Sequence, residues 1–156
     1  MNTYMFHNKP SVLFRLVALL LAAVLVLPVT ADASAADAIQ PRGSDYLNSY
    51  NAYVYPAGNG LVQVWFSVIG VDYLDELGAL TIQLYESQDN INWYRAISFS
   101  NDYTPSMLGY NDFLYGSHVD YQGVAGRYYK AYVCIWGGRD GDGDTRYFWT
   151  SAKKAT

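Results

Sequence analysis

Alternation of apolar residues at every second position is the feature that most constrains the fold of this chain. In the stretch "GLVQVWFSVIGV" the apolar positions of one phase are Val62, Val64, Phe66 and Val68. Trp65 belongs to the opposite phase. A period of two places successive side chains on opposite faces of a β-strand, so one face of this segment is predicted to be buried.

The same alternation recurs along the rest of the chain, without any helical periodicity. It is strongest in "RYYKAYVCIW", where one face carries Tyr129, Ala131, Val133 and Ile135. About seven such strands, separated by Gly, Asn and Asp clusters, predict an all-β fold. Within that class, we expect an immunoglobulin-like or fibronectin-like antiparallel β-sandwich.

The N-terminal segment has the three-part layout of a secretory signal peptide. Lys9 and Arg15 precede an apolar run at 16–27, and small residues follow it. Twelve apolar residues are fewer than the roughly twenty that span a bilayer, and we place cleavage after Ala35, with Ala33 and Ala38 as alternatives. An uncleaved N-terminal anchor is the competing interpretation. The predicted organisation is a signal peptide at 1–35, a flexible leader at 36–44 and one domain at 45–153.

The charge of the chain argues against nucleic acid as a partner. After residue 35 it has eight Lys and Arg against thirteen Asp and Glu. Proteins that bind nucleic acid or anionic lipid carry basic stripes, and none is present. After signal cleavage, no segment is apolar and long enough to span a membrane.

Two local patterns predict structural roles. Leu80, Ile82 and Leu84 are expected on one face of a strand that turns through "SQDNIN" and returns as a second strand from Trp93 to Phe99. In this turn Ser87 and Asp89 are expected to bond to turn amides, as in Asp-box turns. "GVAGRYY" places a tyrosine after a glycine corner, as in the tyrosine corner of β-sandwiches. The Tyr129 hydroxyl is therefore expected to bond back to the corner backbone.

Residues 101–117, "NDYTPSMLGYNDFLYGS", have no clear alternation and contain a proline and two glycines. This composition predicts a long connecting loop. Long ordered loops often carry binding residues.

Three aspartates alternate in the glycine-rich segment "GGRDGDGDTRYFWTS": Asp140, Asp142 and Asp144. Alternate carboxylates in a loop can converge on calcium. An EF-hand loop counted from Asp140 would require Gly at position 145 and an acid at position 151, which are Thr145 and Ser151 here. We therefore favour the tip of a hairpin whose last strand begins at Thr145, with calcium as the minority hypothesis and no other cofactor.

The aromatic content exceeds what one small core requires. If Val64 and Val133 face inwards, then Trp65, Tyr132 and Trp136 fall on the outer faces of their strands. Outward aromatic side chains can stack on sugar rings or partner surfaces. The alternative is cross-strand pairing that only stiffens the sheet.

Cys134 is the only cysteine, so no intramolecular disulfide can form. It is expected to be a shielded small apolar residue between Tyr132 and Trp136. A Cys134–Cys134 bridge between two chains is the alternative for an exported protein with an odd cysteine.

No catalytic constellation is recognisable. His118 is the only histidine after residue 35, which excludes a His-pair zinc site, and no serine sits in a nucleophile elbow. Glu76 and Glu86, the only glutamates, do not form an evident acid pair. The sequence therefore predicts a protein that is not an enzyme.

Four stretches, "YVYPAGNGLVQVWFSV", "LGALTIQLYESQDN", "GRYYKAYVCIWGG" and "GDTRYFWTSAK", resemble a family of small exported proteins of Gram-positive bacteria that is classed as a domain of unknown function. The similarity covers about Asp45 to Lys153. The resemblance implies export and a single small domain, and it supplies no activity, ligand or site residue.

The sequence thus predicts a secreted, non-catalytic binding protein. Its partner would be an extracellular glycan or protein, held by the outer aromatic side chains and the loops at 101–117 and 137–144. Two alternatives remain: a small secreted effector that acts on the envelopes of other bacteria, and a hydrolase that uses His118.

Overall fold

The computed structural model describes residues 44–156. They form seven β-strands and one short 3-10 helix, η1, and this part of the chain contains no α-helix. All strand pairs are antiparallel. The elements are β1 (Leu47–Gly58), β2 (Leu61–Ser87), β3 (Tyr94–Ser100), η1 (Pro105–Met107), β4 (Leu108–Gln122), β5 (Tyr128–Arg139), β6 (Asp142–Trp149) and β7 (Lys153–Lys154). The prediction of an all-β fold is therefore confirmed.

Strand β2 organises the sheet, because its 27 residues serve two sets of neighbours. Residues 61–70 pair with β1 on one side, and residues 61–69 pair with β4 on the other. Residues 76–87 pair with β5, and residues 81–86 pair with β3. We call the first set, β1 with 61–70 and 114–122, the first half-sheet. The second half-sheet consists of β3, 76–87, β5 and β6.

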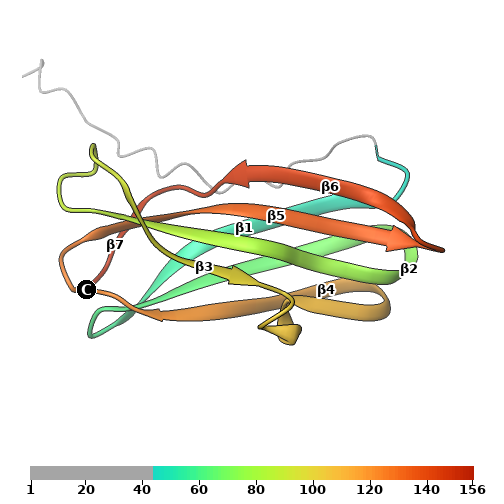
Figure 1. Cartoon of the computed structure of the whole chain (residues 1–156), viewed down its shortest axis with the longest axis horizontal. Coiled ribbons are helices and arrows are strands. Elements are labelled where there is room, and N and C mark those ends of the chain that lie inside the picture. Colours follow the sequence, from blue (N-terminus) through green and yellow to red (C-terminus); the bar gives the residue numbers. More distant parts are fainter. Residues whose placement is uncertain (1–43) are drawn as a thin grey trace, which may run out of the picture. The chain divides into compact units, whose positions relative to one another are not determined.

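The sheet curls because β2 and β4 both bend at the same place. The register between them breaks between Ile69 and Leu74, opposite Leu114 and Asp112. Gly70 allows the bend, since a Cβ atom at this position would lie 2.6 Å from the carbonyl oxygen of Asp72. Figure 1 shows β2 running along the molecule and doubling back at the right-hand end.

The two half-sheets enclose one core. From the first half-sheet it takes the predicted inward face of β2, and from the second it takes the predicted inward face of β5. The buried side chains from these two strand faces are Val62, Val64, Phe66, Val68, Tyr129, Ala131, Val133 and Ile135. Two faces of one curled sheet thus cover a common core, as the two layers of a sandwich do. The immunoglobulin-like or fibronectin-like arrangement within the all-β class stays a prediction.

Two sequence predictions about local structure were wrong. The register of β2 against β5 shifts between Ala79 and Thr81, so Leu80 falls at a bulge and is only half-buried, while Ala79 takes the core position. The predicted long loop at 101–117 is mostly strand. Its turn ends at η1, and β4 begins at Leu108, where a bend and two glycines had hidden the alternation.

Packing continues at both ends of the described residues. The hydroxyl of Ser44, the last residue of the predicted leader, donates a hydrogen bond to Asp144. At the other end Ala155 is buried, and the carbonyl oxygen of Thr156 accepts a hydrogen bond of 2.9 Å from the N–H of Gly60. The predicted signal peptide and residues 36–43 of the leader lie outside the described residues.

Candidate functional site: an aromatic platform on the second half-sheet

The outer face of the second half-sheet carries a row of aromatic side chains. Strand β5 places Lys130, Tyr132, Cys134 and Trp136 on this face, opposite to the side chains that it contributes to the core. Across the ladder, Tyr132 pairs with Trp149 of β6. The neighbouring positions on the two flanking strands are Tyr147 of β6, opposite Cys134, and Tyr85 of β2, opposite Lys130.

These rings contact one another in a continuous series. The ring centroids of Tyr132 and Tyr147 are 6.0 Å apart, and the rings are stacked. Trp149 lies 4.9 Å from Tyr132 and 5.1 Å from Tyr85, in both cases with tilted rings. Trp149 is 49% exposed and Tyr147 is 61% exposed. Such offset and tilted contacts stabilise aromatic pairs while leaving ring faces open to solvent.

Lys130 holds the platform together at one end. Its ammonium group lies 4.3 Å from the ring centroid of Trp93 and 4.7 Å from that of Trp149. Because Trp93 follows the turn at 87–92, this double cation–π contact fastens that turn to β6. We call Tyr85, Trp93, Lys130, Tyr132, Tyr147 and Trp149 the aromatic platform.

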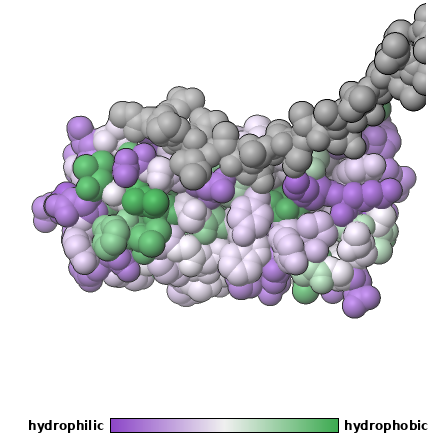
Figure 2. All heavy atoms as spheres, turned by 180° about the vertical axis from the view of Figure 1, so that it is seen from behind, coloured by the Kyte–Doolittle hydropathy of each residue, from purple (hydrophilic) through white to green (hydrophobic). Residues whose placement is uncertain are grey.

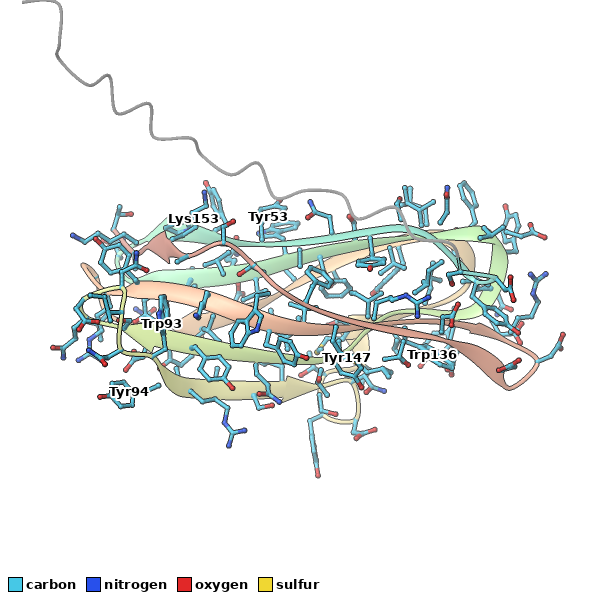
Figure 3. All side chains as sticks on the ribbon, turned by 90° about the horizontal axis from the view of Figure 1, so that it is seen from above. Tyr53, Trp93, Tyr94, Trp136, Tyr147 and Lys153 are labelled. Atoms are coloured by element: carbon cyan, nitrogen blue, oxygen red, sulfur yellow. The ribbon has the colours of Figure 1, made fainter. Side chains whose placement is uncertain are left out.

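Figure 3 shows the two half-sheets from above. Trp93, Tyr147 and Trp136 follow one another along the second half-sheet, whereas Tyr53 points away on the side of the first. Trp136 therefore continues the aromatic row beyond the platform. It lines a hollow of about 250 Å³ together with Asp75, Glu76, Gly138, Arg139, Gly141 and Asp142.

The side of the platform facing β3 offers polar groups. Gln83 lies between Tyr132 of β5 and Ser98 of β3. Its carbonyl oxygen accepts a hydrogen bond of 3.1 Å from the hydroxyl of Tyr85. Its amide nitrogen has no hydrogen-bond partner among residues 44–156, so a ligand on the platform could accept from it.

Cys134 lies beneath the platform. Its residue is 3% exposed, and burial raises the pKa of the thiol. The hydrogen bond to Cys134 raises the pKa of Tyr147. The thiol is thus protonated at neutral pH and covered by the platform. A bridge to a second chain would require this cover to open.

Trp65, which the sequence grouped with Tyr132 and Trp136, lies on the other half-sheet. Its ring stacks on His118 with centroids 4.3 Å apart, and its Nε1 donates a hydrogen bond of 3.0 Å to Gln63. Alternation in the sequence showed only that these three side chains face outward. It did not show which half-sheet each strand joins. Trp65 therefore does not contribute to the platform.

His118 is held by the stack on Trp65 and lies 3.7 Å from a carboxylate oxygen of Asp120. Among residues 44–156 no serine hydroxyl bonds to this histidine. Its surroundings do not assemble a nucleophile with a base.

The residues predicted to be structural lie at the end of the molecule opposite the bend. The Tyr129 hydroxyl accepts a hydrogen bond of 2.8 Å from the N–H of Val124 and donates one of 3.2 Å to Glu86. Burial raises the pKa of Tyr129. Glu86 also forms an ion pair of 2.6 Å with Arg127, beside a hollow of about 230 Å³.

The turn at 87–92 is built around Asp89. Its carboxylate accepts hydrogen bonds from the N–H groups of Asn92 and Ile91 and from the side chains of Asn92 and Ser87. These bonds, led by that from the Asn92 backbone, hold the pKa of Asp89 well below its usual value. The turn is therefore locked by its own side chains.

The three alternating aspartates do not share one loop. Asp140 and Gly141, with φ values of 55° and 79°, form the two-residue tip of the β5–β6 hairpin, and β6 begins at Asp142 instead of the predicted Thr145. Asp142 accepts a hydrogen bond from Tyr46, and Asp144 pairs with Arg146 at 3.5 Å. Within the part of the chain that the structure describes, no group of three or more His, Cys, Asp or Glu side chains is arranged to hold a metal ion.

Sequence reasoning placed Tyr132 and Trp136 on an outer face and assigned Trp93 to the turn. It missed Lys130, Tyr147 and Trp149 as members of one surface. A signal was present, because Tyr147 and Trp149 alternate in "TRYFWTS" as Lys130 and Tyr132 do in "RYYKAYVCIW". Only the register between β5 and β6 shows that these two rows of side chains are neighbours on one surface.

No known protein family, curated protein or solved structure matches this chain. The resemblance to a family of exported Gram-positive proteins therefore stays a proposal. In residues 44–156, no helix has the length and apolar character needed to cross a membrane.

Proposed function

We propose that this chain is a secreted, non-catalytic binding protein that takes an oligosaccharide on the aromatic platform. The observation that carries the proposal is the open pair Tyr147 and Trp149, two residues apart on β6 and backed by Tyr132. A pyranose ring presents an apolar C–H face that stacks on such rings, and hydroxyl groups at its edge. The amide of Gln83 supplies a donor for those hydroxyl groups.

Rigidity supports this assignment. Side chains that are fixed before binding lose little conformational entropy when a ligand arrives. Lys130 fixes Trp93 and Trp149, and the hydrogen bond to Gln83 fixes Tyr85. The platform is therefore largely preorganised.

The charge on this face favours sugars that carry carboxylate groups. Lys130 lies within the platform, and Arg95 is an exposed residue on β3 opposite Tyr85. Among residues 44–156 Arg95 has no acidic partner. A carboxylate-bearing sugar would complement these two cations.

The test is a glycan array that contains neutral and carboxylate-bearing oligosaccharides, followed by titration of the bound sugars. Trp149→Ala and Tyr147→Ala should each weaken binding by about tenfold or more, because they remove central aromatic contacts. Trp65→Ala is the matched control, since it removes a tryptophan from the other half-sheet and should leave affinity unchanged. An array without any bound sugar, or equal losses in all three variants, refutes the proposal.

A further inference from the structure

A second surface lies at the end of the molecule where β2 and β4 bend. Five large hydrophobic side chains are exposed here: Val71, Tyr73, Tyr110, Phe113 and Leu114. Leu114 pairs across the ladder with Ile69, two residues before Val71, and the rings of Tyr73 and Phe113 are 5.4 Å apart. Tyr110 lies opposite Glu76, where β2 and β4 pair again after the bend. We call these five residues the apolar end. Figure 2 shows hydrophobic side chains gathered at the corresponding end of the rear face.

Folding brings acidic residues from four distant segments to the same end. The β5–β6 hairpin meets the bend of β2, because the N–H of Asp140 donates a hydrogen bond of 2.7 Å to Asp75 and Arg139 lies 3.5 Å from Asp72. The first residues of the described chain join them through the bond from Tyr46 to Asp142. The acidic residues at this end, here called the acidic ring, are Asp45, Asp72, Asp75, Glu76, Asp112, Asp140, Asp142 and Asp144.

Most of the basic residues in the described part of the chain lie away from this end. Arg139 and Arg146 are the only basic side chains at this end within residues 44–156, and both are paired with aspartates. The other five basic residues of that range lie away from it: Arg95, Arg127, Lys130, Lys153 and Lys154. The apolar end is therefore surrounded by a net negative charge that its own arginines do not neutralise.

The apolar end and the acidic ring together favour one kind of binding partner over others. A second copy docked through the same surface would bring two acidic rings together, and an anionic membrane would be repelled in the same way. A partner with apolar side chains at its centre and lysine or arginine around them would gain from both features. We propose that the apolar end is a docking surface for a basic, amphipathic segment of another protein.

Such docking is independent of sugar binding, because it uses different residues. Hydrophobic contact supplies the affinity, and the acidic ring raises the association rate and selects basic partners. Binding through this surface must consequently weaken as salt increases.

The test uses a synthetic amphipathic helical peptide with leucine on one face and lysine on the other. Titration into the protein at low and at high salt should show saturable binding that weakens with salt. The same peptide with glutamate in place of lysine should not bind. A peptide with serine in place of leucine should bind at least tenfold more weakly than the leucine peptide.

Variants separate docking from nonspecific attraction between charges. Val71→Ser and Phe113→Ser should each weaken peptide binding about tenfold, while the double variant Asp72→Asn/Glu76→Gln should reduce its dependence on salt. Tyr55→Ser is the control, because Tyr55 is an exposed residue of β1 that lies away from the bend. Melting curves establish that each variant is folded.

Three outcomes would overturn the proposal. They are equal binding of the glutamate peptide, undiminished binding by Val71→Ser and Phe113→Ser, and a dimer in sedimentation that Val71→Ser converts to monomer. The last would identify a second copy as the occupant.

Discussion

The Tyr129 hydroxyl accepts a hydrogen bond from the N–H of Val124, five residues before it and on the other side of a glycine corner. The same hydroxyl donates to Glu86, which is paired with Arg127. One phenol therefore joins the corner before β5 to the end of β2. Because the Tyr129 side chain is fully buried, packing holds its hydroxyl at the point where it meets both partners.

Replacing Tyr129 with phenylalanine tests how much the hydrogen bonds of this hydroxyl stabilise the fold. Tyr129→Phe leaves the Val124 N–H without its acceptor and should lower the free energy of unfolding by about 1–3 kcal/mol. Urea denaturation measures the change. Tyr103→Phe is the control, since Tyr103 is 91% exposed and should shift stability little. Equal stabilities of Tyr129→Phe and the unsubstituted protein would show that the bond contributes nothing.

The turn around Asp89 predicts a dependence of stability on pH. Its folded-state pKa is lowered below the ordinary value of 3.8, chiefly by the backbone N–H groups of Asn92 and Ile91. A carboxyl group whose pKa is lowered by folding stabilises the folded state at pH values above its unfolded-state pKa. This contribution is lost as the pH falls below about 4. Asp89→Ala should therefore be less stable at neutral pH, with a difference that narrows under acid.

Asp102→Ala is the matched control for this turn. Asp102 also follows a serine by two residues, but its carboxylate accepts one hydrogen bond, from Ser100. Thermal melts between about pH 2 and pH 7 should show a smaller, flatter loss for Asp102→Ala. A loss in Asp89→Ala that stays constant across this range would contradict the assignment.

Alternation along the chain was sufficient to predict the buried faces of β5 and of the first part of β2. The buried faces that carry Val64 and Val133 follow from the local sequence, because the alternation within each strand shows which of its side chains point inward. Leu80 was misplaced because the bulge between Ala79 and Thr81 reverses the phase, so the buried face of Ile82 and Leu84 continues at Ala79 and not at Leu80. Such a bulge is stabilised by long-range packing, which a period of two does not record.

The platform could be predicted only in part for a related reason. Tyr132 was assigned to an outer face, yet its neighbours depend on which strand pairs with β5. That pairing also separates Trp65 from Tyr132, since β2 doubles back at Gly70 and passes from one half-sheet to the other. Outward aromatic residues were identified correctly as a class, whereas their grouping required the topology.

Tyr147 should control the reactivity of Cys134. Burial raises the pKa of this thiol, so little thiolate is present near neutral pH and the intact protein should react slowly with an aromatic disulfide reagent. Tyr147→Ala uncovers the thiol and should speed the reaction by about tenfold or more. Tyr55→Ala, on the first half-sheet, should leave the rate unchanged. Equal rates for Tyr147→Ala and the intact protein would mean that another group covers Cys134.

The aspartates at the β5–β6 hairpin predict how the protein responds to calcium. Asp142 accepts a bond from Tyr46, and Asp144 is held by Ser44 and Arg146. Recruiting them to an ion would cost these contacts, so calcium at several millimolar should leave the melting temperature unchanged. A ligand that binds only the folded state must raise that temperature. A rise that magnesium fails to reproduce, and that Asp142→Asn abolishes while Asp120→Asn does not, would instead establish a weak calcium site at this hairpin.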